Sequence, residues 1–381
     1  MPVTYPKNRW AWVEVSLAAI RKNTRAFKAL LEPGVKMMCA VKADAYGHGA
    51  LRCGKYLEKA GADAFAVACL SEALQLRQGG ITKTILILGY TSAEYARVLA
   101  DFDITQTLVD ESHALELDKA AREANVTLKG HIKLDTGMSR AGLFAQGREA
   151  AMQAAMAAER MSRLSHVKVT GMYTHFSVAD TPSQDEYTAW QLDNYKTVMD
   201  YLTSRGLRPE TCHTSNSAAI LYHPETQIDM VREGVMLYGM YPDSMPQYGP
   251  LKPVMALKTR VSQVRDFPAG TTVSYGRTFK GNEPFTTAVT LAGYADGYPR
   301  RLSNNTTVTI NGERYPQAGR ICMDMCMALV DGAKVKRGDT VTLIGGDSIS
   351  WEEASQKVGT INYELTCLVT NRVPRVYINE D

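Results

Sequence analysis

Cysteine is scarce in this sequence of 381 residues, and its placement argues against a disulfide scaffold or a zinc cage. The 7 cysteines form no C-x-x-C pair and are odd in number, which fits reduced thiols. The 7 histidines are equally scattered along the chain, so none of them has the spacing of a metal-binding cluster. We therefore expect no bound metal.

Long apolar runs are also missing, which argues against a membrane-spanning protein. No stretch of about 18 uncharged apolar residues occurs. The N-terminal run MPVTYPKNRWAWVEV has no apolar segment after its lysine and arginine, so it does not resemble a signal peptide. We expect a cytoplasmic protein without a membrane partner.

Neither sign of charge dominates the chain. Its 43 lysines and arginines against 40 aspartates and glutamates leave a net charge of +3 without basic runs, so we expect no nucleic-acid partner. Hydrophobic residues make up 45% and charged residues 22%, as in folded globular proteins. The length predicts about two domains, or one large barrel with an appendage. We expect a small-molecule substrate.

Short β-rich runs alternate with helical patterns over the first part of the chain. Ser16 is suited to cap a helix that ends near Pro33-Gly34, ahead of the first strand. Eight βα units then follow, and their strand runs are VKMMCAV, DAFAVA, TILILG, ITQTLV, LKGHIKL, VKVTGMYTHF, a poorly marked run before Cys212-His213, and QIDMVR. Eight units are the number that a parallel (β/α)8 TIM-type barrel needs. We predict this barrel, an α/β fold, over residues 11–247.

The pattern changes after Tyr241-Pro242. The segment DSMPQYGPLKP is typical of a linker, and beyond it short strands with turn residues replace the helical periodicity. Asn311-Gly312 between two alternating runs predicts a β-hairpin. We predict a C-terminal all-β domain over residues 248–381, joined by residues 1–10 and by the isolated run WAWVEV that begins at Trp10.

Lys42 is the first candidate for chemistry, because it ends the first barrel strand in the run AVKADAYGHGA. The C-terminal ends of barrel strands face the catalytic mouth, where a lysine beside apolar residues can lose its charge and act as nucleophile or base. A lone lysine at a strand end is more often solvated. Here Tyr46 and the Gly-x-Gly turn at 47–49 follow at once, and a hydroxyl beside such a turn suits a phosphate ester.

The run AVKADAYGHG resembles the pyridoxal-phosphate lysine motif of the alanine racemase family. Further stretches resemble that family in the same order: KLDTGMSR (133–140), GMYTHFSVAD (171–180), SNSAA (215–219), REGVMLYG (232–239), VSYGRTF (273–279), GYADGYPR (293–300), GRICMD (319–324), INYELTC (361–367) and RVPRVY (372–377). The resemblance spans almost the whole chain. It implies a barrel with a β domain, pyridoxal 5'-phosphate as cofactor, and interconversion of L- and D-alanine for cell-wall peptidoglycan.

The resemblance also implies how the cofactor is held. Lys42 matches the lysine that binds it covalently, and Arg232 matches the residue beside the pyridine nitrogen. The phosphate would be bound by Tyr46, Ser217, Tyr363 and the backbone at Gly234 and Val235. Loops after the last two strands of a barrel commonly bind phosphate, which agrees with the positions of SNSAA and REGV. An arginine keeps its proton, so it leaves the ring nitrogen unprotonated and weakens the electron sink.

Racemisation needs two acid/base groups on opposite faces of the substrate α-carbon. The resemblance assigns one role to Lys42 and the other to Tyr275, with His175 and Arg232 as the polar neighbours of that tyrosine. Sequence pattern alone would make Tyr275 a core aromatic of the β domain. In the family this tyrosine enters the site from the other subunit, which implies a head-to-tail homodimer.

The remaining matches concern the substrate. Arg140 resembles the residue that orients the substrate carboxylate, and Met323 with Asp324 resembles a stretch that closes over the substrate from the partner chain. Lys133 matches a position that often carries a carbamylated lysine, whose negative charge could pair with Arg140. The access corridor would be lined by Tyr294, Arg300, Arg320 and Ile361.

Three other functions compete with alanine racemisation. A pyridoxal-phosphate decarboxylase would need an acidic partner at the ring nitrogen, where Arg232 stands. A non-catalytic, single-barrel carrier of the cofactor would have no β domain. A racemase for serine or a broader range of amino acids is the nearest alternative, although the bulk of Tyr363 favours alanine.

Overall fold

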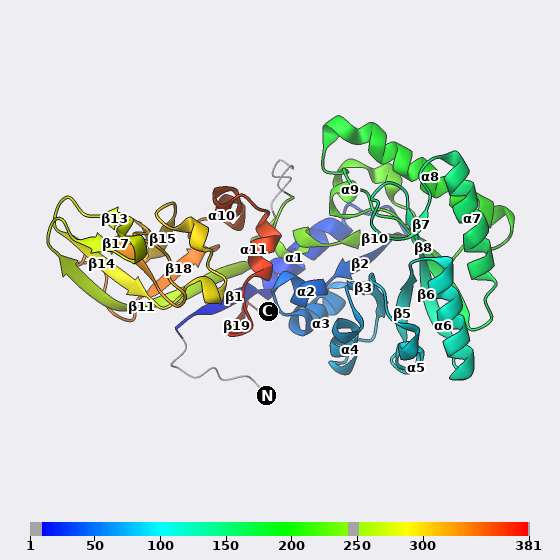
Figure 1. Ribbon diagram of the computed structural model, residues 1–381, viewed down its shortest axis with the longest axis horizontal. Helices are drawn as coiled ribbons and strands as arrows, with labels where there is room; N and C mark the ends of the chain where they lie inside the picture. The colour runs from blue at the N-terminus through cyan, green and yellow to red at the C-terminus, as the bar shows by residue number, and fades with distance from the viewer. Residues whose placement is uncertain (1–9, 243–250, 380–381) are drawn as a thin grey trace.

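The computed structural model describes residues 10–242 and 251–379 and contains two domains (Figure 1). In the first domain, eight parallel strands form a closed barrel, in which each strand pairs with the next and the last pairs with the first. They are β2 (Lys36–Ala40), β3 (Ala64–Val67), β4 (Thr84–Ile87), β5 (Ile104–Leu108), β6 (Leu128–Asp135), β8 (Val167–Tyr173), β9 (Thr211–His213) and β10 (Met230–Glu233). The predicted (β/α)8 barrel is confirmed.

Helices surround the barrel, and the sequence marks where the first of them begins. The Ser16 hydroxyl accepts a hydrogen bond from the backbone N–H of Ala19 at 3.3 Å and so caps α1 (Leu17–Lys28), as predicted. Ile20 and Phe27 lie buried on the inner face of this helix. The other long helices of this domain are α3 (Ala50–Ala60), α4 (Leu70–Gln78), α6 (Glu111–Glu123), α7 (Arg148–Ser162) and α8 (Asp185–Ser204), with the shorter α5 (Ala96–Asp101) and α9 (Ser217–Tyr222).

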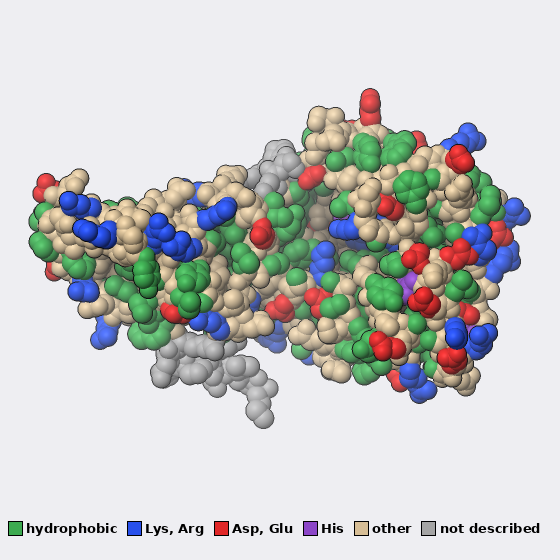
Figure 2. Space-filling view, in the orientation of Figure 1, with side chains coloured by type: hydrophobic (Ala, Val, Ile, Leu, Met, Phe, Trp, Pro, Cys, Tyr) green, Lys and Arg blue, Asp and Glu red, His purple; other side chains and the backbone are tan. Residues whose placement is uncertain are grey.

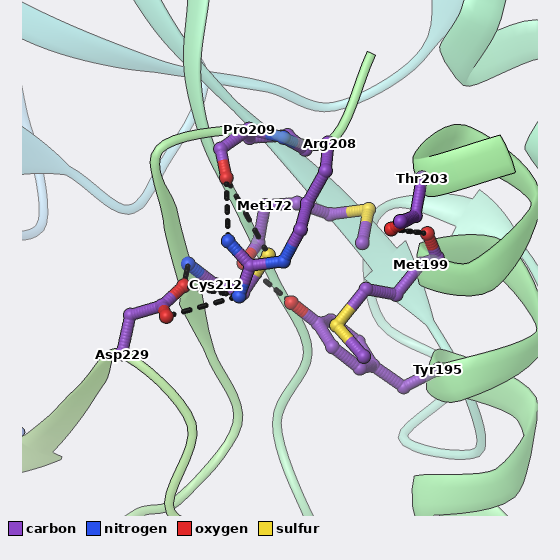
Figure 3. A network of polar contacts seen from close by, with 8 residues as sticks. All are labelled: Met172, Tyr195, Met199, Thr203, Arg208, Pro209, Cys212 and Asp229. Carbon is purple, nitrogen blue, oxygen red and sulfur yellow. Dashed lines mark hydrogen bonds and ion pairs between the residues drawn. The ribbon is translucent and has the colours of Figure 1, made fainter. Parts of the chain in front are cut away.

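β9 is the shortest of the eight strands, and side chains hold it in place (Figure 3). The Asp229 carboxylate accepts a hydrogen bond from the backbone N–H of Cys212 at 2.7 Å and pairs with the Arg208 guanidinium at 2.8 Å. From α8, Tyr195 donates its hydroxyl to a backbone oxygen of β8 at 2.8 Å. The contacts of Asp229, rather than a long apolar run, fix the strand that carries His213, and Tyr195 fixes the neighbouring β8.

A small apolar cluster fills the inside of the barrel. It is separate from the main core, in which the outer faces of the strands meet the helices. Its buried members are Met38, Ala40, Ala64, Ala66, Leu86, Tyr173 and Met230. Ala40 and Ala66 also line the cavity at the barrel mouth, because their small side chains leave space there.

The second domain is built on one eight-stranded sheet. Its long central strand β11 (Met255–Phe267) pairs with β1, β14 and β18. The other strands of this sheet are β1 (Trp12–Ser16), β14 (Phe285–Thr290), β15 (Thr307–Ile310), β16 (Glu313–Pro316), β17 (Cys326–Val330), β18 (Thr340–Ile344) and β19 (Arg375–Ile378). Asn311 and Gly312 join β15 to β16 with φ angles of 54° and 81°, so the predicted hairpin is confirmed.

Two helices interrupt the predicted all-β domain. They are α10 (Trp351–Val358), which Ser350 caps by accepting from the backbone N–H of Glu353 at 3.0 Å, and α11 (Asn362–Cys367). The second domain is therefore mostly but not wholly composed of strands. Figure 1 shows α11 between the two domains, beside the short helix α2 (Lys42–Tyr46). None of the helices in the described residues combines the length and apolar character needed to cross a membrane.

The N-terminal run WVEVS belongs to the second sheet. As β1 it pairs antiparallel with β11 and parallel with β19, although the predicted range of the barrel includes it. The sheet therefore contains the first and the last strand of the described chain. The limits 11–247 and 248–381 stay a prediction, and residues 1–9 and 243–250 lie outside the described residues.

Candidate active site

A cavity of about 440 Å³ opens at the C-terminal ends of the barrel strands. Ten of the predicted site residues line it: Lys42, Tyr46, Lys133, Arg140, His175, Ser217, Arg232, Gly234, Val235 and Tyr363. Figure 2 shows basic side chains in the hollow between the barrel and the second domain. The structure thus brings together residues that lie more than 300 positions apart in the sequence.

Lys42 is followed by an unusual backbone turn. All four residues of Ala43–Tyr46 have positive φ angles, between 50° and 55°. Left-handed backbone costs a residue other than glycine about 1–2 kcal/mol. Hydrogen bonds hold the turn, because the Glu72 carboxylate accepts from the backbone N–H groups of Ala43 and Ala68, each at 2.7 Å. The turn places Lys42 and Tyr46 at the same mouth.

The loop Gly47–Gly49, which follows this turn, is clamped by the second domain. Arg375 donates to the backbone oxygen of Gly47 at 2.9 Å. A Cβ at Gly47 would collide with the backbone of α11, and one at Gly49 would collide with the hydroxyl of Tyr377. Both glycines also have positive φ angles. Glycine is therefore needed at both positions for two reasons: the second domain packs closely against the loop, and the backbone has positive φ angles.

Hydroxyl groups and a backbone amide form a cradle on one side of the cavity. A Cβ at Gly234 would lie 3.1 Å from the Tyr46 hydroxyl and 3.6 Å from the Ser217 hydroxyl oxygen, so it would fill this cradle. The Tyr363 ring lies 6.3 Å from the Tyr46 ring, and Val235 continues the lining. Such neutral donors are suited to a phosphate ester, so the residues present fit the phosphate of the implied cofactor.

Hydrogen bonds to carbonyl and imidazole groups fix the side chain of Arg232. Its guanidinium donates to backbone oxygens of Thr174, His213 and Thr214 at 2.6 to 2.9 Å, and to Nδ1 of His213 at 2.9 Å. A guanidinium only donates, so Nδ1 of His213 accepts and its Nε2–H donates to His131, 2.9 Å away. Neither histidine has a sequence spacing that marks it as a site residue.

Burial keeps this histidine pair neutral. It lowers the pKa of His131 to about 3 and that of His213 well below its usual range, and the Arg232 charge acts in the same direction. Burial lowers the pKa of Arg232 to about 10, so this side chain remains a cation at neutral pH. Arg232 can therefore present a positive charge to the cavity without donating a proton.

The environment of the two cavity lysines favours their neutral forms. Burial, followed by the nearby charge of Arg140, lowers the pKa of Lys42. Burial, followed by the charge of Arg232, lowers the pKa of Lys133 to about 7. The Nζ atom of Lys133 donates to the backbone oxygen of Leu134 at 2.6 Å. A neutral amine is a nucleophile, so this environment suits covalent chemistry at either lysine.

Tyr275 and Met323 do not line the cavity. Tyr275 is 69% exposed, so it is not the core aromatic that sequence pattern alone would predict. Positive φ angles at Ser274 and Gly276 flank it, and the Ser274 hydroxyl donates to the backbone oxygen of Arg320 at 2.6 Å. Met323 is 53% exposed. The second domain thus displays both side chains on its surface.

Comparison with known families gives two matches that together span nearly the whole chain. Residues 15–242 match the family described as alanine racemase, N-terminal domain, and residues 254–377 match alanine racemase, C-terminal domain. The alanine racemase of Methanococcus maripaludis is 41% identical over 374 residues, which cover 97% of this chain and 98% of the relative. That of Clostridium novyi is 42% identical over 377 residues, covering 97% and 96%.

Solved structures give the same result. The alanine racemase of Clostridium difficile 630 superposes with a TM-score of 0.91 at 36% identity, covering 98% of this chain and 97% of the other. The same protein in complex with cycloserine gives a TM-score of 0.89 at 35% identity, covering 99% and 98%. An alanine racemase from E. faecalis gives 0.90 at 33% identity, covering 97% and 99%.

Proposed function

The chain belongs to the alanine racemase family, and from this premise we propose how its residues interconvert L- and D-alanine. Members of this family depend on pyridoxal phosphate, and their product serves cell-wall peptidoglycan. In our proposal Lys42 and Tyr275 are the two bases. The observation that carries the proposal is the cavity in which the Lys42 amine, with its lowered pKa, shares one mouth with the phosphate cradle and with Arg232.

In this proposal the chain holds pyridoxal phosphate at three points. Lys42 would bind it covalently, Arg232 would serve its pyridine nitrogen, and Tyr46, Ser217, Tyr363 and the backbone N–H groups of Gly234 and Val235 would hold its phosphate. When bound, the cofactor supplies a ring that stabilises negative charge on the α-carbon of the substrate. Because Arg232 keeps its proton, this stabilisation is only moderate, which suits a reaction that moves one proton.

The remaining residues act on the substrate. Arg140 orients its carboxylate, and His175 and Arg232 support the phenol of Tyr275. Carbamylation of Lys133 would turn a buried amine into an anion beside two arginines, which would offset their mutual repulsion. Met323 closes over the substrate from the partner chain.

The exposure of Tyr275 supports a shared site. A tyrosine that acts in catalysis must reach a substrate, yet this one lies on the surface of the second domain and outside the cavity of its own chain. In a head-to-tail homodimer each Tyr275 reaches the partner's cavity, so each site uses residues of two chains.

The competing functions are not favoured. Both family matches name alanine racemase, and the second of them covers the domain that a single-barrel carrier would lack. Arg232 stands where a decarboxylase needs an acid. Selectivity for alanine over serine follows from the relatives and from the bulk of Tyr363 at the cavity wall.

The test uses purified protein with pyridoxal phosphate and a panel of L-amino acids, followed by chiral separation of the products. We expect D-alanine to form faster than any other D-amino acid. The Lys42→Ala variant should form none and should retain no cofactor after borohydride treatment and denaturation. Cofactor fixed to a lysine of that variant would refute the role of Lys42.

A further inference from the structure

Glu233 is a buried acid at the edge of the phosphate cradle, and the mechanism above does not use it. It ends β10 and is 0% exposed. Its Oε1 accepts hydrogen bonds from the Ser217 hydroxyl at 2.7 Å and from the backbone N–H of Gly234 at 3.0 Å. Its Oε2 has no hydrogen-bond partner among the described residues. Half of this carboxyl group is thus buried without a partner, which is unfavourable for an anion.

Among residues 10–242 and 251–379, the groups that face Glu233 supply no positive charge. On β2 its register neighbour is Cys39, and Tyr46 faces it from α2; burial raises the pKa of both, so both are neutral at pH 7. From α9 the Ser217 hydroxyl donates a hydrogen bond to it. The preceding Arg232 donates to the groups beneath the cavity instead. Burial raises the pKa of Glu233 to about 7, against the effect of its two hydrogen bonds.

Ser217 cannot serve this carboxylate and a phosphate at the same time. A serine hydroxyl has one proton to donate, and here that proton is directed at Oε1 of Glu233. The backbone N–H of Gly234 is likewise directed at Ser217 and Glu233, at 3.0 Å each. A phosphate in the cradle would therefore compete with an anionic Glu233 for the same two donors, and it would also lie beside a like charge.

Building on the proposed function, we infer that Glu233 is a cofactor-site residue that takes up one proton from solvent when the phosphate binds. The new carboxylic acid donates to the Ser217 oxygen, and the Ser217 hydroxyl then donates to the phosphate. No covalent bond other than the new O–H changes. Phosphate binding is consequently coupled to proton uptake, and the affinity for the phosphate falls as the pH rises above neutrality.

The experiment uses the full-length protein freed of cofactor and 4-deoxypyridoxine 5'-phosphate as the probe. This probe carries the ring and the phosphate but has no aldehyde, so it forms no covalent bond with Lys42. Titration calorimetry at pH 8, in two buffers of different ionisation enthalpy, counts the protons taken up on binding. The wild-type protein should take up about one proton more than Glu233→Gln, whose amide mimics the neutral acid.

The dissociation constant of the probe gives a second measurement. Between pH 7.5 and 9 the dissociation constant of the wild type should rise, relative to that of Glu233→Gln, by up to about tenfold per pH unit. Glu94→Gln removes one negative charge from an exposed residue and should behave as the wild type does. If Glu233→Gln retains the wild-type proton uptake and pH dependence, the inference is wrong although the phosphate site stands. If no variant binds the probe, the proposed cofactor site itself fails.

Infrared spectroscopy tests the wild type without any substitution. Adding the probe at pH 8 should produce the carbonyl band of a protonated carboxylic acid, which an ionised carboxylate does not show. No such band at saturating probe would overturn the inference, even if Glu233→Gln did not fold.

Discussion

Replacing Tyr275 by Phe should impair catalysis without weakening the fold. The side chain is 69% exposed, and surface substitutions usually change stability by no more than about 0.5 kcal/mol. The change removes the phenol but keeps the ring, so cofactor binding should persist. Conversion of L- to D-alanine should fall by about 10²–10⁴, the contribution of one acid/base group.

Mixing this variant with Lys42→Ala tests whether the two bases come from different chains. Random exchange makes about half of the dimers hybrid, and each hybrid has one site with both wild-type residues and one with neither. About a quarter of all sites should therefore recover, which is at least about 25-fold above the residual activity of Tyr275→Phe alone. Each variant carries a different affinity tag, so hybrids can be purified before D-alanine is measured.

The control is a mixture of either variant with the double variant, which creates no complete site. Both such mixtures should remain at the background of their components. If purified hybrids regain no activity, the two bases act within one chain, and the shared site that we propose is wrong.

Three further predictions concern the cavity. Gly234→Ala places a Cβ 3.1 Å from the Tyr46 hydroxyl and should weaken cofactor binding by about tenfold, whereas Gly54→Ala, whose nearest contact is 3.5 Å, should bind normally. Because burial lowers the pKa of Lys42, the rate of covalent cofactor attachment should rise with pH and level off below the ordinary lysine pKa of about 10.4; a plateau only above that pH would contradict the buried environment. Lys133 should carry the added mass of CO₂ in native mass spectrometry and lose it in acid, and an unmodified lysine at saturating bicarbonate would exclude carbamylation.

The architecture could be predicted where local patterns decide it. The strand runs are apolar because barrel strands are buried on both faces, and the Ser16 cap is visible as a residue type at a position. The sequence of β9 lacks a clear strand pattern. Side-chain contacts of Asp229 and Arg208 hold this strand, and such contacts produce no periodic pattern of apolar residues. The start of α10 does carry the capping pattern of a helix, because Glu353 follows Ser350 by three residues. The strand-rich sequence around it obscured this pattern.

The site could be predicted less directly. Family resemblance named ten residues that the structure brings to one cavity, but the groups that support them come from long-range contacts. Glu72 reaches back from α4 to hold the turn after Lys42, and His213 lies beneath Arg232. Nothing in the spacing of these residues indicates those contacts. The exposure of Tyr275 is likewise a property of the folded surface.

The clamp on the loop at 47–49 bears on the order in which the site forms during synthesis. Arg375 and Tyr377, which hold this loop, leave the ribosome only after the entire barrel has been made. The same is true of Tyr363 in the phosphate cradle. A nascent chain can therefore close its barrel while the backbone around Lys42 still lacks its outer support. We expect the cofactor to bind only after the second domain is complete. Lys42 is therefore among the first site residues to be synthesised and among the last to reach its final position.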